Sequence, residues 1–191
     1  MAKKIHFDSI VVVDIEATCW EKGKQPKDER SEIIEIGLCS LNIKTLESSE
    51  KTQLFIKPIQ SNVSEFCTDL TGLTQAKLDK EGIAFVEACK IMQEKFNTKK
   101  RVWASYGDYD KTMFQNQCKD FGVDYPFNRR HINVKTYLPI VFGLTKELGM
   151  DKGLNVVGLP LIGVHHCGAD DAWNISRILS ELIRGGAAYT T

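Results

Sequence analysis

Ile10-Val11-Val12-Val13-Asp14-Ile15-Glu16 is an apolar run that ends in two carboxylates. The β-branched residues at 10–13 are typical of a buried strand. Residues two apart on a strand point to the same face, so Asp14 and Glu16 lie side by side. Two such charges at the edge of a core are costly unless a positive group, most simply a divalent metal, lies between them. The alternative is an ordinary solvated pair, which is common in a chain with 25 acidic residues.

The composition is that of one soluble globular domain covering residues 1–191, with 42% hydrophobic and 26% charged residues. The 25 basic and 25 acidic residues balance, which disfavours a protein that coats duplex nucleic acid. An enzyme that grips only a nucleic-acid end is compatible with this balance, because acids at a metal site would cancel basic residues elsewhere.

The six cysteines are scattered, and none forms a Cys-x-x-Cys pair, which argues against a structural zinc knuckle. The start of the chain does not resemble a signal peptide, and no apolar segment reaches the length of a membrane span. Scattered thiols without an export signal predict a reducing setting. We therefore expect a cytoplasmic protein without a membrane partner.

The order of the predicted elements indicates an α/β domain with a mixed sheet. Apolar runs predict strands at 10–16, 31–41 and 53–59, which short connections make antiparallel neighbours. Helical periodicity over 84–92 leads to a short strand at 102–104, and such a crossover implies parallel pairing. A helix, a strand, a mostly helical region and a last helix then follow at 108–120, 131–134, 136–158 and 169–184.

Helix faces distinguish Asp110 from its neighbour Asp108. The helix predicted here carries an apolar stripe of Met113, Phe114, Cys118 and Phe121. Stepping back three or four residues from the start of that stripe reaches Asp110, so this carboxylate should point toward the core. Asp108 aligns with the polar face, which predicts a helix N-cap or a surface acid.

The same argument selects Asp171 over Asp170 in the last helix, whose apolar stripe is Ile175, Ile178, Leu179 and Leu182. Asp171 lies one turn before the stripe. Asp170 shares a predicted solvated face with Asn174, Arg177 and Glu181. His165 and His166 precede this helix, where one of them can lie beside Asp171.

Four inward acids and a histidine meet the requirements of a two-metal phosphoryl transfer. Two divalent ions roughly 3.5–4 Å apart stabilise both the attacking and the leaving oxygen of such a displacement. A histidine, with an unperturbed pKa of about 6.5, can take the proton from the attacking water. The alternative for both histidines is a loop or capping role.

These residues resemble the motif set of the DEDDh 3′–5′ exonucleases, which include RNase T and the proofreading subunit of bacterial DNA polymerase III. The motifs are Asp14-Ile-Glu16-Ala-Thr18, Asp110, and His166 five residues before Asp171. Longer stretches resemble the branch that trims histone-mRNA and small-RNA 3′ ends, whose bacterial relatives include sporulation-inhibitor-like proteins. These stretches span residues 14–19, 32–37, 66–74 and 166–171. The similarity covers essentially the whole chain.

The resemblance implies an RNase H-like fold with a central mixed five-stranded sheet flanked by helices. It implies that two Mg²⁺ or Mn²⁺ ions are bound by Asp14, Glu16, Asp110 and Asp171. It also implies that His166 is the general base. If His165 were the base, the same spacing, with four residues in between, would pair it with Asp170; His166 is preferred.

The resemblance further implies contacts with the substrate. Thr18 would lie close to the terminal nucleotide, and the segment with Phe66 and Thr71 lines the substrate groove in relatives. Stacking on an aromatic ring is worth about 1–3 kcal/mol per base. The candidates for stacking, each with core packing as the alternative, are Tyr109, Trp20 and Phe66.

We expect a metal-dependent 3′–5′ exonuclease that removes nucleoside 5′-monophosphates from the 3′ ends of single-stranded RNA or short DNA. RNA is the preferred substrate, and a monomer is favoured. One alternative is a non-catalytic regulator that binds a protein partner; another is a phosphodiesterase for dinucleotides or small nucleotides.

Glu35 matches a family position that supports the site. The alternative for Glu35 is a solvent-facing residue of the strand.

Overall fold

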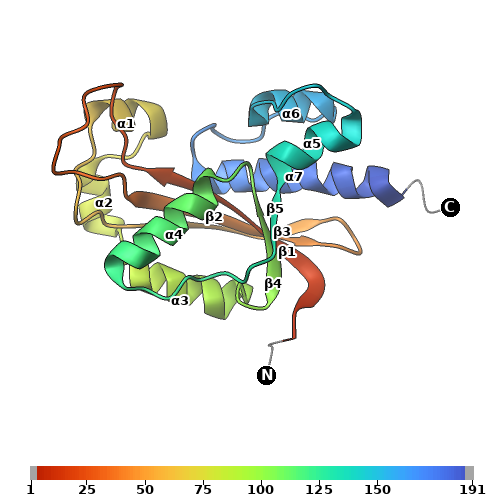
Figure 1. Ribbon diagram of the computed structural model, residues 1–191, viewed down its shortest axis with the longest axis horizontal. Helices are drawn as coiled ribbons and strands as arrows, with labels where there is room; N and C mark the ends of the chain where they lie inside the picture. The colour runs from red at the N-terminus through yellow and green to blue at the C-terminus, as the bar shows by residue number, and fades with distance from the viewer. Residues whose placement is uncertain (1–3, 188–191) are drawn as a thin grey trace.

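The computed structural model describes residues 4–187, so residues 1–3 and 188–191 of the predicted domain lie outside the description (Figure 1). A five-stranded sheet with the order β3-β2-β1-β4-β5 forms its centre. Strand β1 pairs antiparallel with β2 and parallel with β4, which confirms the predicted mixed sheet. The strands are β1 His6–Ala17, β2 Ile33–Asn42, β3 Ser48–Phe55, β4 Arg101–Ser105 and β5 His131–Asn133.

Helices cover both faces of this sheet. Figure 1 shows α3 and α4 on one face and α5, α6 and α7 on the other, with α1 and α2 at one end. The helices are α1 Glu65–Thr71, α2 Gln75–Glu81, α3 Phe85–Phe96, α4 Tyr109–Phe121, α5 Val134–Phe142, α6 Met150–Val156 and α7 Gly168–Ala187. None of the helices in this described part of the chain is long and apolar enough to cross a membrane.

The central strand β1 divides its side chains between two cores. Val11, Val13 and Ile15 pack with residues of α3 and α4. Ile10 and Val12 pack with residues of α5, α6 and α7. Because side chains alternate along a strand, Asp14 and Glu16 continue the second set. The two carboxylates therefore lie on the α7 side of the sheet, at the end of the central strand.

The third strand is displaced from its prediction. It covers Ser48–Phe55 rather than 53–59, and Ile56 makes only an isolated bridge with Ile83. Strand β3 is at the edge of the sheet and pairs only with β2, so its polar residues 49–52 can face water. The apolar pattern therefore marked only the end of this strand.

Helices α1 and α2 were not predicted, because seven residues are too few to show a clear apolar period. Their caps carry the missing signal. Ser64 accepts a hydrogen bond from the backbone N–H of Cys67, and Thr74 accepts one from that of Lys77. Gly72 ends α1 in a left-handed conformation. A serine or threonine at the N-cap position, followed about eight residues later by a glycine at the C-cap position, would have located both helices.

The first turn of α7 rests directly on the backbone of β2. Gly37 of β2 pairs with Asp14 of β1, so this contact lies beside the carboxylates. A Cβ atom on Gly37 would lie 2.0 Å from the carbonyl carbon of Gly168 and 2.3 Å from the amide nitrogen of Ala169. Only a residue without a side chain allows α7 to approach this closely, and this approach brings Asp171 to the end of β1.

We expect Gly37→Ala to lower the free energy of unfolding by about 1–3 kcal/mol or more, because the methyl group overpacks this backbone contact. Urea denaturation followed by circular dichroism measures the change. Gly185→Ala in α7 is the matched control: no heavy atom lies within 4 Å of its added Cβ, so it should be neutral or stabilising. An unchanged midpoint for Gly37→Ala would contradict the contact.

Candidate active site

A pocket of about 360 Å³ lies at the end of β1. Strand β1 contributes two acids, the start of α4 one, and the start of α7 another, while the loop before α7 contributes both histidines. The lining residues among those predicted are Asp14, Glu16, Asp110, Asp171, His165, His166 and Tyr109. Four acids from three separate elements therefore share one pocket.

Three of the four acids form a tight cluster. Carboxylate oxygens of Asp14, Glu16 and Asp171 lie within 4.8 Å of one another. Asp110 lines the same pocket outside this group, and its Oδ1 accepts a hydrogen bond of 3.1 Å from the backbone N–H of Ile15. Oδ1 of Asp171 is buried without a hydrogen-bond partner among the described residues. A buried oxygen that lacks a donor, beside two further carboxylates, fits a hard divalent cation.

Burial and mutual repulsion oppose the ionisation of these acids. Burial, and then the charges of Asp110 and Asp171, raise the pKa of Asp14 well above its ordinary value. Burial, and then the charge of Glu35, raise the pKa of Glu16 to about 8. Burial raises the pKa of Asp110 to about 6. A bound divalent cation would stabilise the ionised carboxylates and so remove this penalty.

Glu16→Gln should stabilise the metal-free protein at pH 8. The folded-state pKa of Glu16 lies above the unfolded value, so its ionisation increasingly opposes folding as the pH rises from about 4.5 to about 8. The neutral amide lacks this cost, and each kcal/mol gained raises Tm by about 2–4 °C. Thermal melts in EDTA at pH 5 and pH 8 measure the difference, which should be larger at pH 8.

Adding Mn²⁺ should reverse this order, because a cation held by Asp14, Glu16 and Asp171 would stabilise the folded unsubstituted protein more than the variant, which lacks the carboxylate at position 16. The Tm of the unsubstituted protein should then rise more than that of Glu16→Gln. Equal shifts in both proteins would contradict a role for Glu16 in metal binding. Lys90→Met on α3 serves as a control for a charge change at an exposed ion pair.

The two histidines contact different acids. Nδ1 of His165 lies 2.8 Å from Oδ2 of Asp171, and the same oxygen accepts a hydrogen bond of 2.9 Å from the backbone N–H of His166. Nδ1 of His166 lies 3.8 Å from Oε1 of Glu16. The imidazole rings stack with centroids 4.1 Å apart. Both rings therefore line the acid cluster, and His166 takes a left-handed backbone conformation with φ of 65°.

Burial, and then the neighbouring charge of His165, lower the pKa of His166. A neutral imidazole at neutral pH can accept a proton, which suits the predicted general base. Neither ring is enclosed, since each side chain is 40% exposed. The predicted base is thus accessible to water.

The helix-face argument places Asp110 and Asp171 correctly. Each of these residues is only 4% exposed, whereas the side chain of Asp108 is 66% exposed. Asp108 occupies the N-cap position of α4 without a capping hydrogen bond from its side chain. The inward acids are therefore the two that the apolar stripes of α4 and α7 selected.

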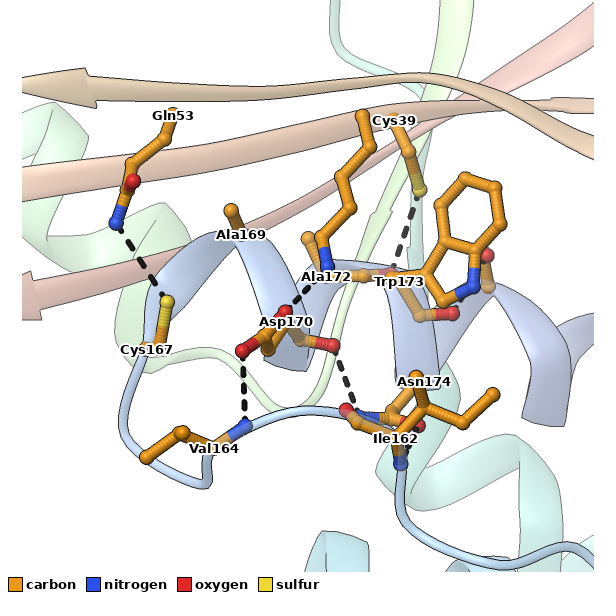
Figure 2. Close-up of polar contacts among 12 residues, drawn as sticks. Cys39, Gln53, Ile162, Val164, Cys167, Ala169, Asp170, Ala172, Trp173 and Asn174 are labelled. Carbon is orange, nitrogen blue, oxygen red and sulfur yellow. Dashed lines mark hydrogen bonds and ion pairs between the residues drawn. The ribbon is translucent and has the colours of Figure 1, made fainter.

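The predicted solvated face of α7 is wrong. Asn174 is fully buried, and the side chain of Asp170 is 16% exposed. Figure 2 shows the reason: the loop ahead of α7 lies over this face, with Val164 bonded to Asp170 and Ile162 to Asn174. A helix face that is polar in sequence is covered here by backbone, whose N–H and C=O groups these side chains bind.

The predicted substrate residues do not all reach the pocket. Tyr109 lines it and is 57% exposed, which suits a stacking platform. Phe66 on α1 is 44% exposed but lies outside the lining, and Trp20 lines a neighbouring depression. Thr18 is fully buried, and its hydroxyl bonds Ser61 and accepts the backbone N–H of Glu32. The side chain of Thr18 thus organises the β1–β2 connection instead of facing the pocket.

The remaining predicted groove residue, Thr71, ends α1. Its hydroxyl donates to the carbonyl of Cys67 and accepts the backbone N–H of Leu73. The neighbouring Leu70 does line the pocket and is 40% exposed. The segment named from the resemblance therefore reaches the pocket through a different side chain.

Glu35 is a buried acid beside the site, so the solvent-facing alternative is wrong. Its Oε1 accepts hydrogen bonds from Gln53 Nε2 at 2.8 Å and from the backbone N–H of Ala169 at 3.3 Å. Burial raises its pKa. Glu35 therefore connects β2 and the edge strand to the first turn of α7, between His166 and Asp171.

Four pocket residues were not predicted individually: Cys19, Leu70, Tyr106 and Met150. Cys19 and Leu70 lie in stretches that carry the family resemblance, and that signal could have found them. Tyr106 follows β4 and Met150 begins α6, so these two approach β1 only in the folded chain. All four residues make the pocket wall partly apolar around the acids.

Comparisons with known proteins match this architecture. The model of the exonuclease family of the RNase T type matches residues 11–179. The human 3′-5′ exoribonuclease 1 is 32% identical over 95% of this chain and 54% of its own length. The 3′-5′ exonuclease Snipper of Drosophila melanogaster is 26% identical over 96% of this chain and 72% of its own length. The chain thus spans about half the length of the human relative.

Solved structures give the same result. The nuclease domain of 3′hExo, a DEDDh family member bound to rAMP, superposes with a TM-score of 0.84 at 30% identity. The alignment covers 96% of this chain and 95% of that domain. A 3′-exonuclease that recognises the histone mRNA stem-loop gives a TM-score of 0.82 at 29% identity, covering 96% of this chain and 66% of that one.

Proposed function

The chain belongs to the exonuclease family of the RNase T type, and we propose that it hydrolyses nucleic acids from the 3′ end. The proposed reaction releases nucleoside 5′-monophosphates from single-stranded RNA, or from short DNA, one at a time. The observation that carries the proposal is the cluster of Asp14, Glu16 and Asp171, with an unpartnered buried oxygen and two histidines beside it. Such a cluster is costly for a non-catalytic regulator, because its charges oppose folding.

The exonuclease family is dependent on divalent metal ions, and we propose Mg²⁺ or Mn²⁺ for this chain. Asp14, Glu16 and Asp171 would hold one ion between them, and Asp110 would complete the set for two. When bound, the ions supply positive charge that stabilises the attacking and leaving oxygens of the phosphodiester. Oxygen ligands alone suit these hard cations.

The histidine supplies the base. The imidazole of His166, whose pKa is lowered, takes a proton from the water that attacks the terminal phosphodiester. The water oxygen bonds to phosphorus, and the P–O bond to the 3′ oxygen of the preceding nucleotide breaks. The leaving oxygen takes a proton from solvent, which gives a new 3′ hydroxyl and a free nucleoside 5′-monophosphate. The carboxylate of Asp171 accepts a hydrogen bond from the backbone N–H of His166 and so orients the loop that carries the histidine.

The preference for RNA is part of the proposal. It is supported by the human relative, a 3′-5′ exoribonuclease, and by the structural relative that binds the histone mRNA stem-loop. The exposed Tyr109 and Leu70 at the pocket mouth offer surfaces on which a terminal base can stack or pack. Cytoplasmic localisation and a monomeric state stay predictions.

Incubation with 5′-labelled single-stranded RNA in Mn²⁺ or Mg²⁺ tests the proposal. A ladder that shortens one nucleotide at a time, with nucleoside 5′-monophosphates as the products, is expected, and EDTA should abolish it. The same oligonucleotide as DNA measures the sugar preference. Cleavage of dinucleotides alone would instead support a small-nucleotide phosphodiesterase, and no cleavage of any of these substrates would support a binding module.

A further inference from the structure

The loop that carries the histidines is held to α7 by polar side chains. Asn174 accepts the backbone N–H of Ile162 at 3.1 Å and donates to its carbonyl at 2.8 Å. Arg177 donates to the carbonyl of Pro160 at 2.7 Å. Figure 2 shows the loop running along this face of α7, with dashed lines to Asp170 and Asn174. A row of side chains on one helix face therefore binds the loop by its backbone.

Asp170 is the last member of this row and the one nearest the histidines. Its Oδ2 accepts the backbone N–H of Val164 at 2.8 Å, and its Oδ1 pairs with the ammonium group of Lys51. Gly163 passes so close that an added Cβ would lie 2.2 Å from the carboxyl carbon of Asp170. The carboxylate thus occupies a fitted space between the loop and edge strand β3.

The loop has little apolar burial to hold it. Leu161, Ile162 and Val164 are 42%, 43% and 68% exposed, respectively. Polar contacts must therefore fix its course, and the contact at Val164 comes immediately before His165. The next point of attachment is the backbone N–H of His166 on Asp171. Both imidazoles therefore belong to the short stretch of loop that Asp170 binds at Val164 and Asp171 binds at His166.

We propose that Asp170, held by Lys51, is a positioning residue that sets the orientation of the catalytic histidine. The two adjacent aspartates then have different roles. Asp171 faces the acid cluster, and Asp170 holds the loop at Val164 from the neighbouring face of the helix. Mutation of a residue that orients a side chain of an active site typically costs about 10–100-fold in activity. This inference rests on the proposed function for its kinetic test, but its structural test does not.

The kinetic test uses Asp170→Ala and Lys51→Met in single-turnover assays with 3′-end trimming of RNA. Asp170→Ala should lower the rate about tenfold or more. Lys51→Met should lower it less, because the Val164 contact remains. In both variants, the RNA concentration and the Mn²⁺ concentration that give the half-maximal rate should differ less than twofold from those of the unsubstituted protein. Lys90→Met, which removes an exposed ion pair on α3, is the matched control and should leave the rate unchanged.

A double-mutant cycle separates positioning from general damage. In the background of His165→Ala with His166→Ala, Asp170→Ala should have almost no further effect on the residual rate. An equal loss in both backgrounds would overturn the proposal, since Asp170 would then act on the fold or on the metal site. An unchanged rate for Asp170→Ala alone would overturn it as well.

A readout independent of activity comes from the imidazole signals in ¹H–¹⁵N NMR at fixed pH. The chain has four histidines, so His6 and His131 serve as internal references. Asp170→Ala should shift or broaden the signals of His165 and His166 and leave the references in place. If the signals of His165 and His166 are unchanged in Asp170→Ala, as those of the references should be, the proposal fails. If the signals move but no RNA is cut by the unsubstituted protein, the proposed function fails and the positioning role stands.

Discussion

Asp14→Asn should reduce metal-dependent hydrolysis of RNA by about a thousandfold or more. The amide keeps the shape of the side chain but removes one of three clustered charges that would hold the cation. Loss of several kcal/mol of charge stabilisation in the transition state corresponds to a rate change of this size. The rate under single-turnover conditions, measured over a range of Mn²⁺ concentrations, gives both the loss and the change in metal requirement.

The same substitution should stabilise the metal-free protein. Burial of the carboxylate, and then the charges of the neighbouring acids, raise the pKa of Asp14, so a neutral side chain relieves both costs. An inactive variant with a raised Tm in EDTA therefore cannot be explained by unfolding. Asp108→Asn is the matched control, because Asp108 lies on the neighbouring surface at the start of α4 and should affect neither property strongly. Full metal-dependent activity of Asp14→Asn would refute the assigned site.

The second large effect is expected at the histidines. His166→Ala should lower the rate by about 10²–10⁴-fold, the usual contribution of a general base. His165→Ala should cost far less, since the ring of His165 contacts Asp171 and supports the loop. Because the pKa of His166 is lowered, the rate should rise with pH through a midpoint below about 6.5 and then level off.

The pH profile distinguishes the two rings. The rising limb should vanish in His166→Ala, because no imidazole then has to lose its proton before it can act as the base. It should persist in His165→Ala. If the larger loss and the missing limb instead belong to His165→Ala, the base is His165, and the hydrogen bond that its Nδ1 donates to Asp171 orients the ring.

Periodic patterns in the sequence located the acids, because helices and strands repeat their faces over several residues. Asp110 and Asp171 continue apolar stripes of α4 and α7, and Asp14 and Glu16 continue the strand β1. Each pattern depends only on residues within one element. The fold class and the five strands followed from the order of these elements, and the resemblance added the RNase H-like fold.

Features that depend on contacts between distant segments could not be predicted in this way. The polar face at Asp170 and Asn174 looks solvated until the loop is placed over it. Buried Glu35 has partners from β3 and α7, which lie far away in the chain. The two histidines are adjacent in sequence, so only the course of the loop determines which ring faces which acid.

The packing of α7 against Gly37 has a consequence for the synthesis of the protein. The acids of β1 are synthesised well before Asp171 and both histidines, which follow much later in the sequence. A nascent chain that has not yet released α7 from the ribosome presents Asp14 and Glu16 without the rest of the cluster. The acid cluster is therefore completed only after α7 has been synthesised and has packed onto β2.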